Sequence, residues 1–194
     1  MRDLEIRGTG NLIGPQQSGH MESVGYEMYC RLLEEAICEM KGVEVEKTVE
    51  TLIDLPVSAF IPEQYIKVHS QRISAYKRIA AIENDEDLMD AYDELLDIYG
   101  DVPMVVNNLM EVALIKKLAS EKKFTEIKGS QKSVDLFFDP DNAPDFTELI
   151  TLMAESAGKV ILKNGTKPKV SYMFPEEKNQ KKYLNIIKEF IKKV

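Results

Sequence analysis

The sequence predicts an α+β fold, in which a helical N-terminal half precedes a ββαββα unit with a mostly antiparallel sheet. Between residues 69 and 120, apolar side chains recur at intervals of three and four, which is the spacing of amphipathic helices. After residue 123, short segments of alternating character come in pairs, and a helical segment follows each pair. Paired segments that are neighbours in sequence form hairpins, so the predicted sheet is antiparallel.

The first fifty residues differ in composition from the rest. Residues 1–20 hold four of the ten glycines of the chain. Leu4 and Ile6 alternate with charged neighbours, which predicts a short, half-exposed strand before a glycine-rich loop. Residues 21–41 predict an amphipathic helix, and residues 43–55 predict a strand or an extended linker.

Three further helices are predicted over residues 69–83, 85–99 and 103–120. The second begins after Asn84, whose side chain can cap free backbone N–H groups, and it ends at Gly100. The third opens with a proline at its predicted first position and is apolar on most of its faces. We therefore expect this third helix to lie at the centre of the fold.

The last third of the sequence predicts one supersecondary unit used twice. In its first copy, residues 124–128 and 133–138 form a hairpin that turns at Gly129-Ser130. A helix over 144–157 follows. Its expected buried side chains are Phe146, Leu149, Ile150 and Met153.

In the second copy, residues 159–163 and 168–174 form a hairpin across Asn164-Gly165, a dipeptide that favours tight turns. A closing helix is predicted over residues 177–193. Its expected buried side chains are Leu184, Ile187, Phe190 and Ile191.

Composition indicates a soluble globular protein. The 194 residues are 44% hydrophobic and 30% charged. No segment approaches the roughly 20 apolar residues of a membrane span, and the charged N-terminus is unlike a signal peptide. We therefore expect a cytoplasmic protein without a membrane partner. Cys30 and Cys38 fall in one predicted helix about 12 Å apart, beyond the roughly 7 Å limit of a disulfide, so free thiols are expected.

Charge is distributed unevenly along the chain. The net charge of −8 argues against autonomous tight DNA binding, which requires lysine and arginine. Residues 79–115 contain neither lysine nor arginine. Such a stretch can attract a basic protein partner, and the simpler alternative is a solvated helix face. Its acidic residues are Glu83, Asp85, Glu86, Asp87, Asp90, Asp93, Glu94, Asp97, Asp101 and Glu111.

The C-terminal helix is rich in lysine and lacks the interleaved aromatic residues that stack on bases. We expect these lysines to be solvated and to suit the negative end of the helix dipole. They are Lys178, Lys181, Lys182, Lys188, Lys192 and Lys193.

Signals for enzymatic chemistry are weak. Three residues separate Gly10 from Gly14 in the glycine-rich loop, whereas two residues separate the last two glycines of a dinucleotide-binding fingerprint. Pro15 and Gln16 follow, where a P-loop has Lys and then Ser or Thr. His20 and His69 have no metal-ligand spacing. We predict no catalytic residue, no metal site and no cofactor in this chain.

The same loop carries arginine and glutamine side chains, which suit hydrogen bonding to a phosphate, a carboxylate or another chain. Glycine allows the backbone to approach a ligand closely. The residue chemistry therefore leaves two possibilities open: a binding or coupling loop, and a structural turn with solvated charges. The residues concerned are Arg2, Arg7, Gln16 and Gln17.

Longer runs of the sequence carry a family resemblance. The segment MRDLEIRGTGNLIGPQQSGHMESVGYEMYCRLLEEA resembles the translocation motif of the transcription-repair coupling factor family, also called the Mfd family. RecG branch-migrating helicases share this motif in looser form. The runs IDLPVSAFIPEQYI, RISAYKRIAAIENDEDL and ELLDIYGDVPMVVNNLMEVALIK resemble the C-terminal domain of the same family. The resemblance is close over residues 1 to about 125.

This resemblance implies a parent protein that is an ATP-driven translocase on double-stranded DNA. Such a protein uses ATP and magnesium, displaces stalled RNA polymerase and recruits UvrA in nucleotide excision repair. Residues 1–50 would form the translocation motif and hook helix, with Arg7 and Gln17 as the main coupling residues and Arg2 and Gln16 as secondary ones. The absence of an ATP-binding lobe predicts an excised fragment that does not hydrolyse ATP.

The resemblance also implies that residues 51–194 form a regulatory domain. In the resting protein this domain would pack on a UvrB-like N-terminal module and mask its UvrA-binding surface. We expect Asp90, Asp93, Glu94 and Asp97 to contribute to that docking face. The alternatives are an adaptor with an acidic face that is unrelated to repair, and an enzyme that uses the glycine loop.

Overall fold

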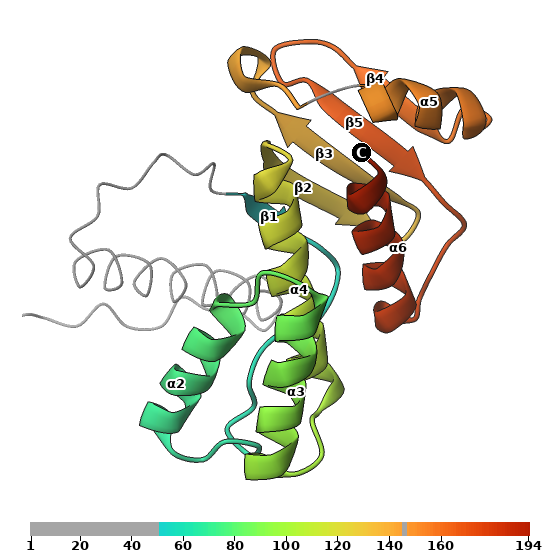
Figure 1. Cartoon of the computed structure of the whole chain (residues 1–194). Helices are drawn as coiled ribbons and strands as arrows, with labels where there is room; N and C mark the ends of the chain where they lie inside the picture. The colour runs from blue at the N-terminus through green and yellow to red at the C-terminus, as the bar shows by residue number, and fades with distance from the viewer. Residues whose placement is uncertain (1–50, 145–146) are drawn as a thin grey trace, which may run out of the picture.

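The structure is a computed structural model that describes residues 51–144 and 147–194. It confirms the α+β fold class: a sheet with helices packed on it is joined to a helical part through one long helix, α4 (Figure 1). Along the chain the elements are β1 (Leu52–Asp54), α2 (His69–Ala80), α3 (Asp85–Tyr99), α4 (Met104–Glu121), β2 (Phe124–Ser130), β3 (Ser133–Phe138), a 3₁₀ turn (Pro140–Asn142), α5 (Thr147–Glu155), β4 (Val160–Lys163), β5 (Lys169–Met173) and α6 (Gln180–Lys193).

Within the described residues, the sheet has five strands in the order β1-β2-β3-β5-β4. The two hairpin pairs, β2–β3 and β5–β4, are antiparallel, as predicted. The pair β3–β5, which joins the two hairpins, is also antiparallel. The edge strand β1 adds a parallel pairing, in which Ile53 lies opposite Ile127 of β2. The described part of the segment predicted as a strand or linker thus contributes Leu52–Asp54 to the sheet. This pairing could not be predicted from local sequence, because the paired residues are more than seventy positions apart.

In the part of the chain that the structure describes, the buried side chains form two groups. The sheet core lies between one face of the sheet and helices α4, α5 and α6, and it includes Val134 and Leu136 of β3. The helical core is formed by α2, α3 and α4 together with Ile61 and Ile66 of the preceding loop. Helix α4 contributes buried side chains to both cores, which confirms its predicted central position.

Helix α3 follows the prediction at both ends. The side chain of Asn84 accepts a hydrogen bond from the backbone N–H of Asp87, and Gly100 has a φ of 81°, a conformation that favours glycine. Helix α2 ends three residues earlier than predicted, and Ile82 beyond it is buried. Pro103 caps α4 in an extended conformation, with a ψ of 148°, so the prediction that it is the first helical residue is wrong.

The first hairpin turns later than predicted. Gly129 and Ser130 continue β2, Ser130 pairs with Ser133, and the turn is formed by Gln131-Lys132. Gly129 is therefore not a turn residue. It lies where the side chains of Tyr183 and Leu55 occupy the space that a Cβ atom would fill. Close packing on a helix, rather than turn geometry, therefore requires glycine at this position.

The second hairpin is confirmed, with residues 164–168 as its loop. In α5, Leu149 is buried as predicted. The prediction that Ile150 is buried is wrong, because this side chain is 66% exposed. Phe146 lies outside the described residues. Helix α6 begins three residues later than predicted, after the capping residue Asn179. Its four predicted core residues, Leu184, Ile187, Phe190 and Ile191, are all buried.

Candidate functional site

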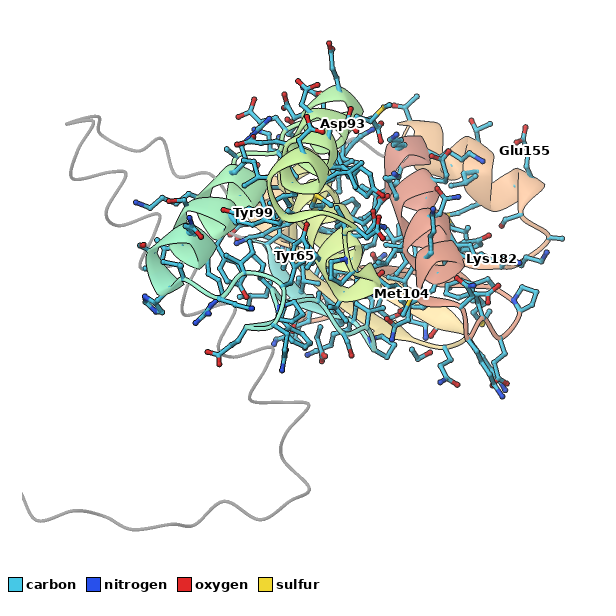
Figure 2. All side chains as sticks on the ribbon, turned by 90° about the horizontal axis from the view of Figure 1, so that it is seen from below. Tyr65, Asp93, Tyr99, Met104, Glu155 and Lys182 are labelled. Carbon is cyan, nitrogen blue, oxygen red and sulfur yellow. The ribbon has the colours of Figure 1, made fainter. Side chains whose placement is uncertain are left out.

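Four exposed carboxylates of α3 form a stripe along the side of the helix that faces away from the helical core. Their spacing of four, three and four residues brings them onto one face of an α-helix. Asp93 lies at the outer edge of the molecule in Figure 2. We call this set the acidic stripe. Its members are Glu86, Asp90, Asp93 and Asp97.

The acidic stripe is electrostatically unfavourable for the helix that carries it. Like charges three or four residues apart repel each other by about 0.2–0.5 kcal/mol per pair. Among the described residues, no ion pair is formed with any of the four carboxylates. Only Glu86, in the first turn, is favoured by the helix dipole. The stripe is therefore suited to a partner that supplies positive charge.

The predicted docking residues divide into two groups. Asp90, Asp93 and Asp97 lie together on the stripe, whereas Glu94 turns toward α2. There its Oε2 accepts a hydrogen bond from Nε of Arg78 at 3.0 Å. Glu86 was not among the predicted docking residues, although its spacing of four residues from Asp90 is a signal that the sequence contains.

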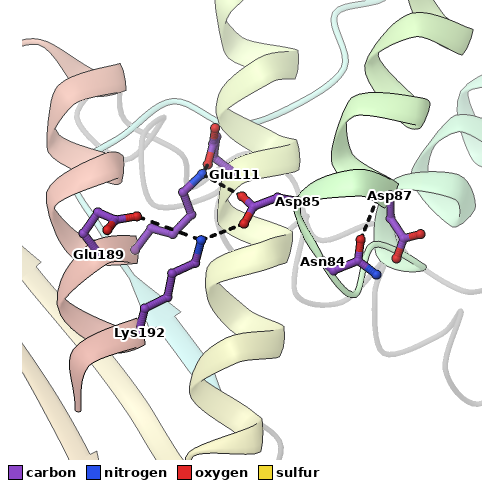
Figure 3. A network of polar contacts seen from close by, with 7 residues as sticks. Asn84, Asp85, Asp87, Glu111, Glu189 and Lys192 are labelled. Atoms are coloured by element: carbon purple, nitrogen blue, oxygen red, sulfur yellow. Dashed lines mark hydrogen bonds and ion pairs between the residues drawn. The ribbon is translucent and has the colours of Figure 1, made fainter.

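Other acidic residues of the 79–115 stretch are neutralised within the molecule. Nζ of Lys188 on α6 lies 2.8 Å from Oε2 of Glu111 and 3.3 Å from Oδ1 of Asp85. Nζ of Lys192 lies 2.6 Å from the second carboxylate oxygen of Asp85 (Figure 3). Because the Lys188 side chain is only 11% exposed, the expectation that this lysine is solvated is wrong.

The pKa values of this network follow from its geometry. The hydrogen bond from Lys192 and the charge of Lys188 hold the pKa of Asp85 below its ordinary value, although partial burial opposes this. Burial tends to lower the pKa of Lys188, but the carboxylates of Glu111 and Asp85 outweigh that effect and raise it. The carboxylate form of Asp85 and the ammonium form of Lys188 are therefore both stabilised near neutral pH.

The sheet face opposite the sheet core carries charged side chains of both signs. Asp135 of β3 lies between Lys169 Nζ and Ser171 Oγ of β5, each at 2.6 Å from one carboxylate oxygen. Both Lys128 and Lys169 lie over the ring of Phe137, and Lys128 is also paired with a neighbouring glutamate. Lys128 and Lys169 are therefore already engaged with carboxylates, which weakens their attraction for the phosphates of a nucleic acid.

The remaining candidates lie outside the described residues. They are the coupling residues Arg2, Arg7, Gln16 and Gln17, together with His20 and both cysteines. Within residues 51–144 and 147–194, no three His, Cys, Asp or Glu side chains are arranged to hold a metal ion. No helix in this part of the chain has the length and apolar character of a membrane span.

Comparisons with known proteins converge on one family. Residues 55–149 match the TRCF domain model. The transcription-repair-coupling factor of Staphylococcus epidermidis is 37% identical over 147 residues, which cover 75% of this chain and 13% of that protein. Those of Staphylococcus haemolyticus and Staphylococcus aureus are each 39% identical over 138 residues, 70% of this chain and 12% of theirs. The chain thus spans about one eighth of the length of these relatives.

A solved structure shares the fold. The crystal structure of the C-terminal domain of transcription-repair coupling factor superposes with a TM-score of 0.60. The match covers 74% of this chain and 89% of that chain at 19% sequence identity.

Proposed function

Because the chain belongs to the transcription-repair-coupling factor family, we propose that residues 51–194 are the regulatory domain of an ATP-driven translocase on double-stranded DNA. In this proposal the whole protein displaces RNA polymerase stalled at a lesion and recruits UvrA for nucleotide excision repair. The domain packs on a UvrB-like N-terminal module in the resting protein. There it masks the surface that binds UvrA, so it acts as an autoinhibitory clamp.

The acidic stripe carries this proposal. Asp90, Asp93 and Asp97 are exposed and repel one another, and no cation within the described chain is paired with them. A basic surface on the N-terminal module would relieve that repulsion on docking. Electrostatic complementarity of this kind also makes docking reversible, because it is sensitive to competing charges and to salt.

For residues 1–50 we propose the role of coupling ATP hydrolysis to movement along DNA, with Arg7 and Gln17 as the principal residues. ATP and magnesium would bind elsewhere in the whole protein. The glycine-rich loop lacks the Lys and the Ser or Thr that a P-loop uses to hold phosphates and magnesium. Purified 1–194 should therefore show no DNA-stimulated ATP hydrolysis above a buffer control.

A reconstitution experiment tests the clamp. The chain is added to a preformed complex of UvrA and the separate UvrB-like module, and the UvrA released is measured. We expect wild-type chain to displace UvrA. An Asp93→Lys/Asp97→Lys variant should need at least about tenfold more chain for the same release, because two attractions become repulsions.

A matched control reverses two exposed carboxylates away from the stripe, Asp141 and Glu155. The control variant has the same net charge as the stripe variant, so it separates a local effect of the stripe from a general effect of charge. Equal displacement by the wild type and both variants would exclude the stripe as the docking face. Capture of a different basic protein with no effect on UvrA would favour the adaptor alternative.

A further inference from the structure

Helices α3 and α6 belong to different parts of the interior. The buried residues of α3, Ala91 and Leu95, lie in the helical core. The buried apolar residues of α6 lie in the sheet core, as Leu184 and Ile187 illustrate. Helix α4 contributes to both cores and joins them through its own side chains. Ala59 of the loop before α2 also packs against both cores. The orientation of α3 relative to the sheet therefore depends on α4, on this loop and on any direct link between α3 and α6.

Such a direct link exists at the first residue of α3. One oxygen of Asp85 faces Nζ of Lys188 at 3.3 Å, and the other faces Nζ of Lys192 at 2.6 Å. Lys188 and Lys192 lie one turn apart on α6, so the single carboxylate of Asp85 bridges both. Glu111 of α4 holds Lys188 from a third element, at 2.8 Å. Oε1 of Glu189 on α6 also lies 3.9 Å from Nζ of Lys192, so the group holds two lysines and three carboxylates.

The backbone that carries Asp85 is itself fixed. The side chain of Asn84 accepts a hydrogen bond from the N–H of Asp87, and the carboxylate of Asp87 accepts one from the N–H of Glu83. These two side-chain hydrogen bonds stabilise the N-terminal end of α3. Asp85 is the first residue of this capped helix, so its contacts with α6 restrain α3 itself and not only the preceding loop.

The burial of Lys188 distinguishes this link from an ordinary surface ion pair. Exposed pairs contribute little, because water solvates both partners well. The Lys188 side chain is almost removed from water, and Glu111 is 17% exposed. Breaking the network would leave a partly buried charge without its partner, which is strongly unfavourable. The network therefore favours one relative position of the three helices.

We propose that Lys188 and Lys192 form a clasp that fixes the orientation of α3, and with it the acidic stripe, relative to the sheet core. Glu86 follows Asp85 directly, and Asp90 lies on the next turn, so movement of the first turn displaces the stripe. The clasp itself follows from the contacts of the described residues. Its consequence for docking rests on the proposed function.

Hydrogen exchange on the full chain tests the clasp. We compare wild type with Lys192→Met, which removes the more exposed lysine, and with Lys188→Met, which keeps the buried volume and removes the charge. Amide exchange in the first two turns of α3 should accelerate about tenfold, with little change in β3 and β5. Lys188→Arg should stay close to wild type, because it keeps the charge.

Lys178→Met is the matched control, because Lys178 is an exposed lysine paired with Glu176 on its own segment. It should leave exchange in α3 unchanged. The clasp is overturned if Lys192→Met and Lys188→Met leave exchange in α3 at the wild-type rate. It is also overturned if exchange accelerates equally in α3 and in the sheet, which would indicate only a general loss of stability.

A second readout separates the clasp from the proposed docking function. In the UvrA displacement assay, the Met variants should need severalfold more chain than wild type, whereas Lys178→Met should not. If wild-type chain displaces no UvrA, the docking function fails and the exchange data still decide the clasp. If exchange in α3 accelerates but displacement is unchanged, the clasp stands and its link to docking is overturned.

Discussion

The hydroxyl group of Tyr183 on α6 lies against the backbone of Gly129 in β2, in the position that a Cβ atom of residue 129 would take. The hydroxyl is buried and has no hydrogen-bond partner among the described residues. Burial, with a smaller effect of Asp54, raises the pKa of Tyr183 well above its ordinary value. The contact joins the last helix to the second strand and sets how closely they approach.

Replacing Gly129 with alanine should destabilise the protein. The added methyl group would overlap the Tyr183 hydroxyl and approach the Leu55 side chain, whose Cδ2 lies 2.6 Å from the ideal Cβ position. Overpacking of this kind costs about 1–3 kcal/mol. Urea denaturation followed by circular dichroism measures the loss as a lower midpoint.

A second substitution shows whether the hydroxyl group is responsible. Tyr183→Phe removes the overlapping atom and a buried polar group without a partner, so alone it should be neutral or slightly stabilising. In the Tyr183→Phe background, Gly129→Ala should cost clearly less than it does in the wild type. The same cost in both backgrounds would show that Tyr183 is not the obstacle.

Reversing one charge of the acidic stripe should stabilise the isolated chain. Asp93→Lys converts repulsion of Asp90 and Asp97 into attraction, and lysine is the better helix former. We expect a gain of about 0.5–1 kcal/mol, measured by thermal or urea denaturation. The gain should shrink in about 1 M salt, where the screening length falls to about 3 Å. A stability loss would show that the stripe already has an internal counter-charge.

Stability should fall in acid because of two carboxylates. The pKa of Asp85 is lowered by Lys192 and Lys188 despite some desolvation. For Asp135, burial opposes ionisation, but hydrogen bonds from Lys169 and Ser171 outweigh it and lower the pKa. A lowered pKa in the folded state contributes stability above the unfolded value near 3.8, and this is lost as pH falls through the folded value.

Urea midpoints measured between about pH 6 and pH 2 test this, over the range in which the stabilisation from such a carboxylate is lost. Asp85→Asn and Asp135→Asn should each lower the midpoint at neutral pH and flatten its decline below about pH 4. An exposed carboxylate such as Asp141 provides the control, because Asp141→Asn should leave the profile unchanged. Profiles of the Asp85 and Asp135 variants that run parallel to wild type would contradict the assignment.

The stability cost of replacing Asn108 should depend on the polarity and charge of the new side chain. This buried residue of α4 donates hydrogen bonds from Nδ2 to the Ser58 carbonyl at 3.0 Å and to Oε1 of Gln180 at 2.7 Å. Asn108→Leu removes the donor and should cost about 1–3 kcal/mol, partly offset by apolar burial. Asn108→Asp should cost more at neutral pH, because it places a buried carboxylate against two oxygen atoms. A smaller cost for aspartate than for leucine would contradict this arrangement.

Part of the acidic stripe could be read from the sequence. Asp90, Asp93 and Asp97 were predicted together from their charge, and helical spacing alone would have added Glu86. The sequence could not separate them from Glu94, Asp85 and Glu111, whose charges look equivalent along the chain. Their cationic partners lie on other helices, and Lys188 is separated from Asp85 by 103 residues.

The sequence by itself determined the fold class, the limits of α3 within a residue, the buried face of α6 and the pairing of each hairpin. These depend on side-chain periodicity and capping, which are properties of neighbouring residues. Only the tertiary structure decided the parallel pairing of β1, the strand position of Gly129, the exposure of Ile150 and the burial of Lys188. Each of these depends on which distant element packs against the residue, and local periodicity carries no information about that partner.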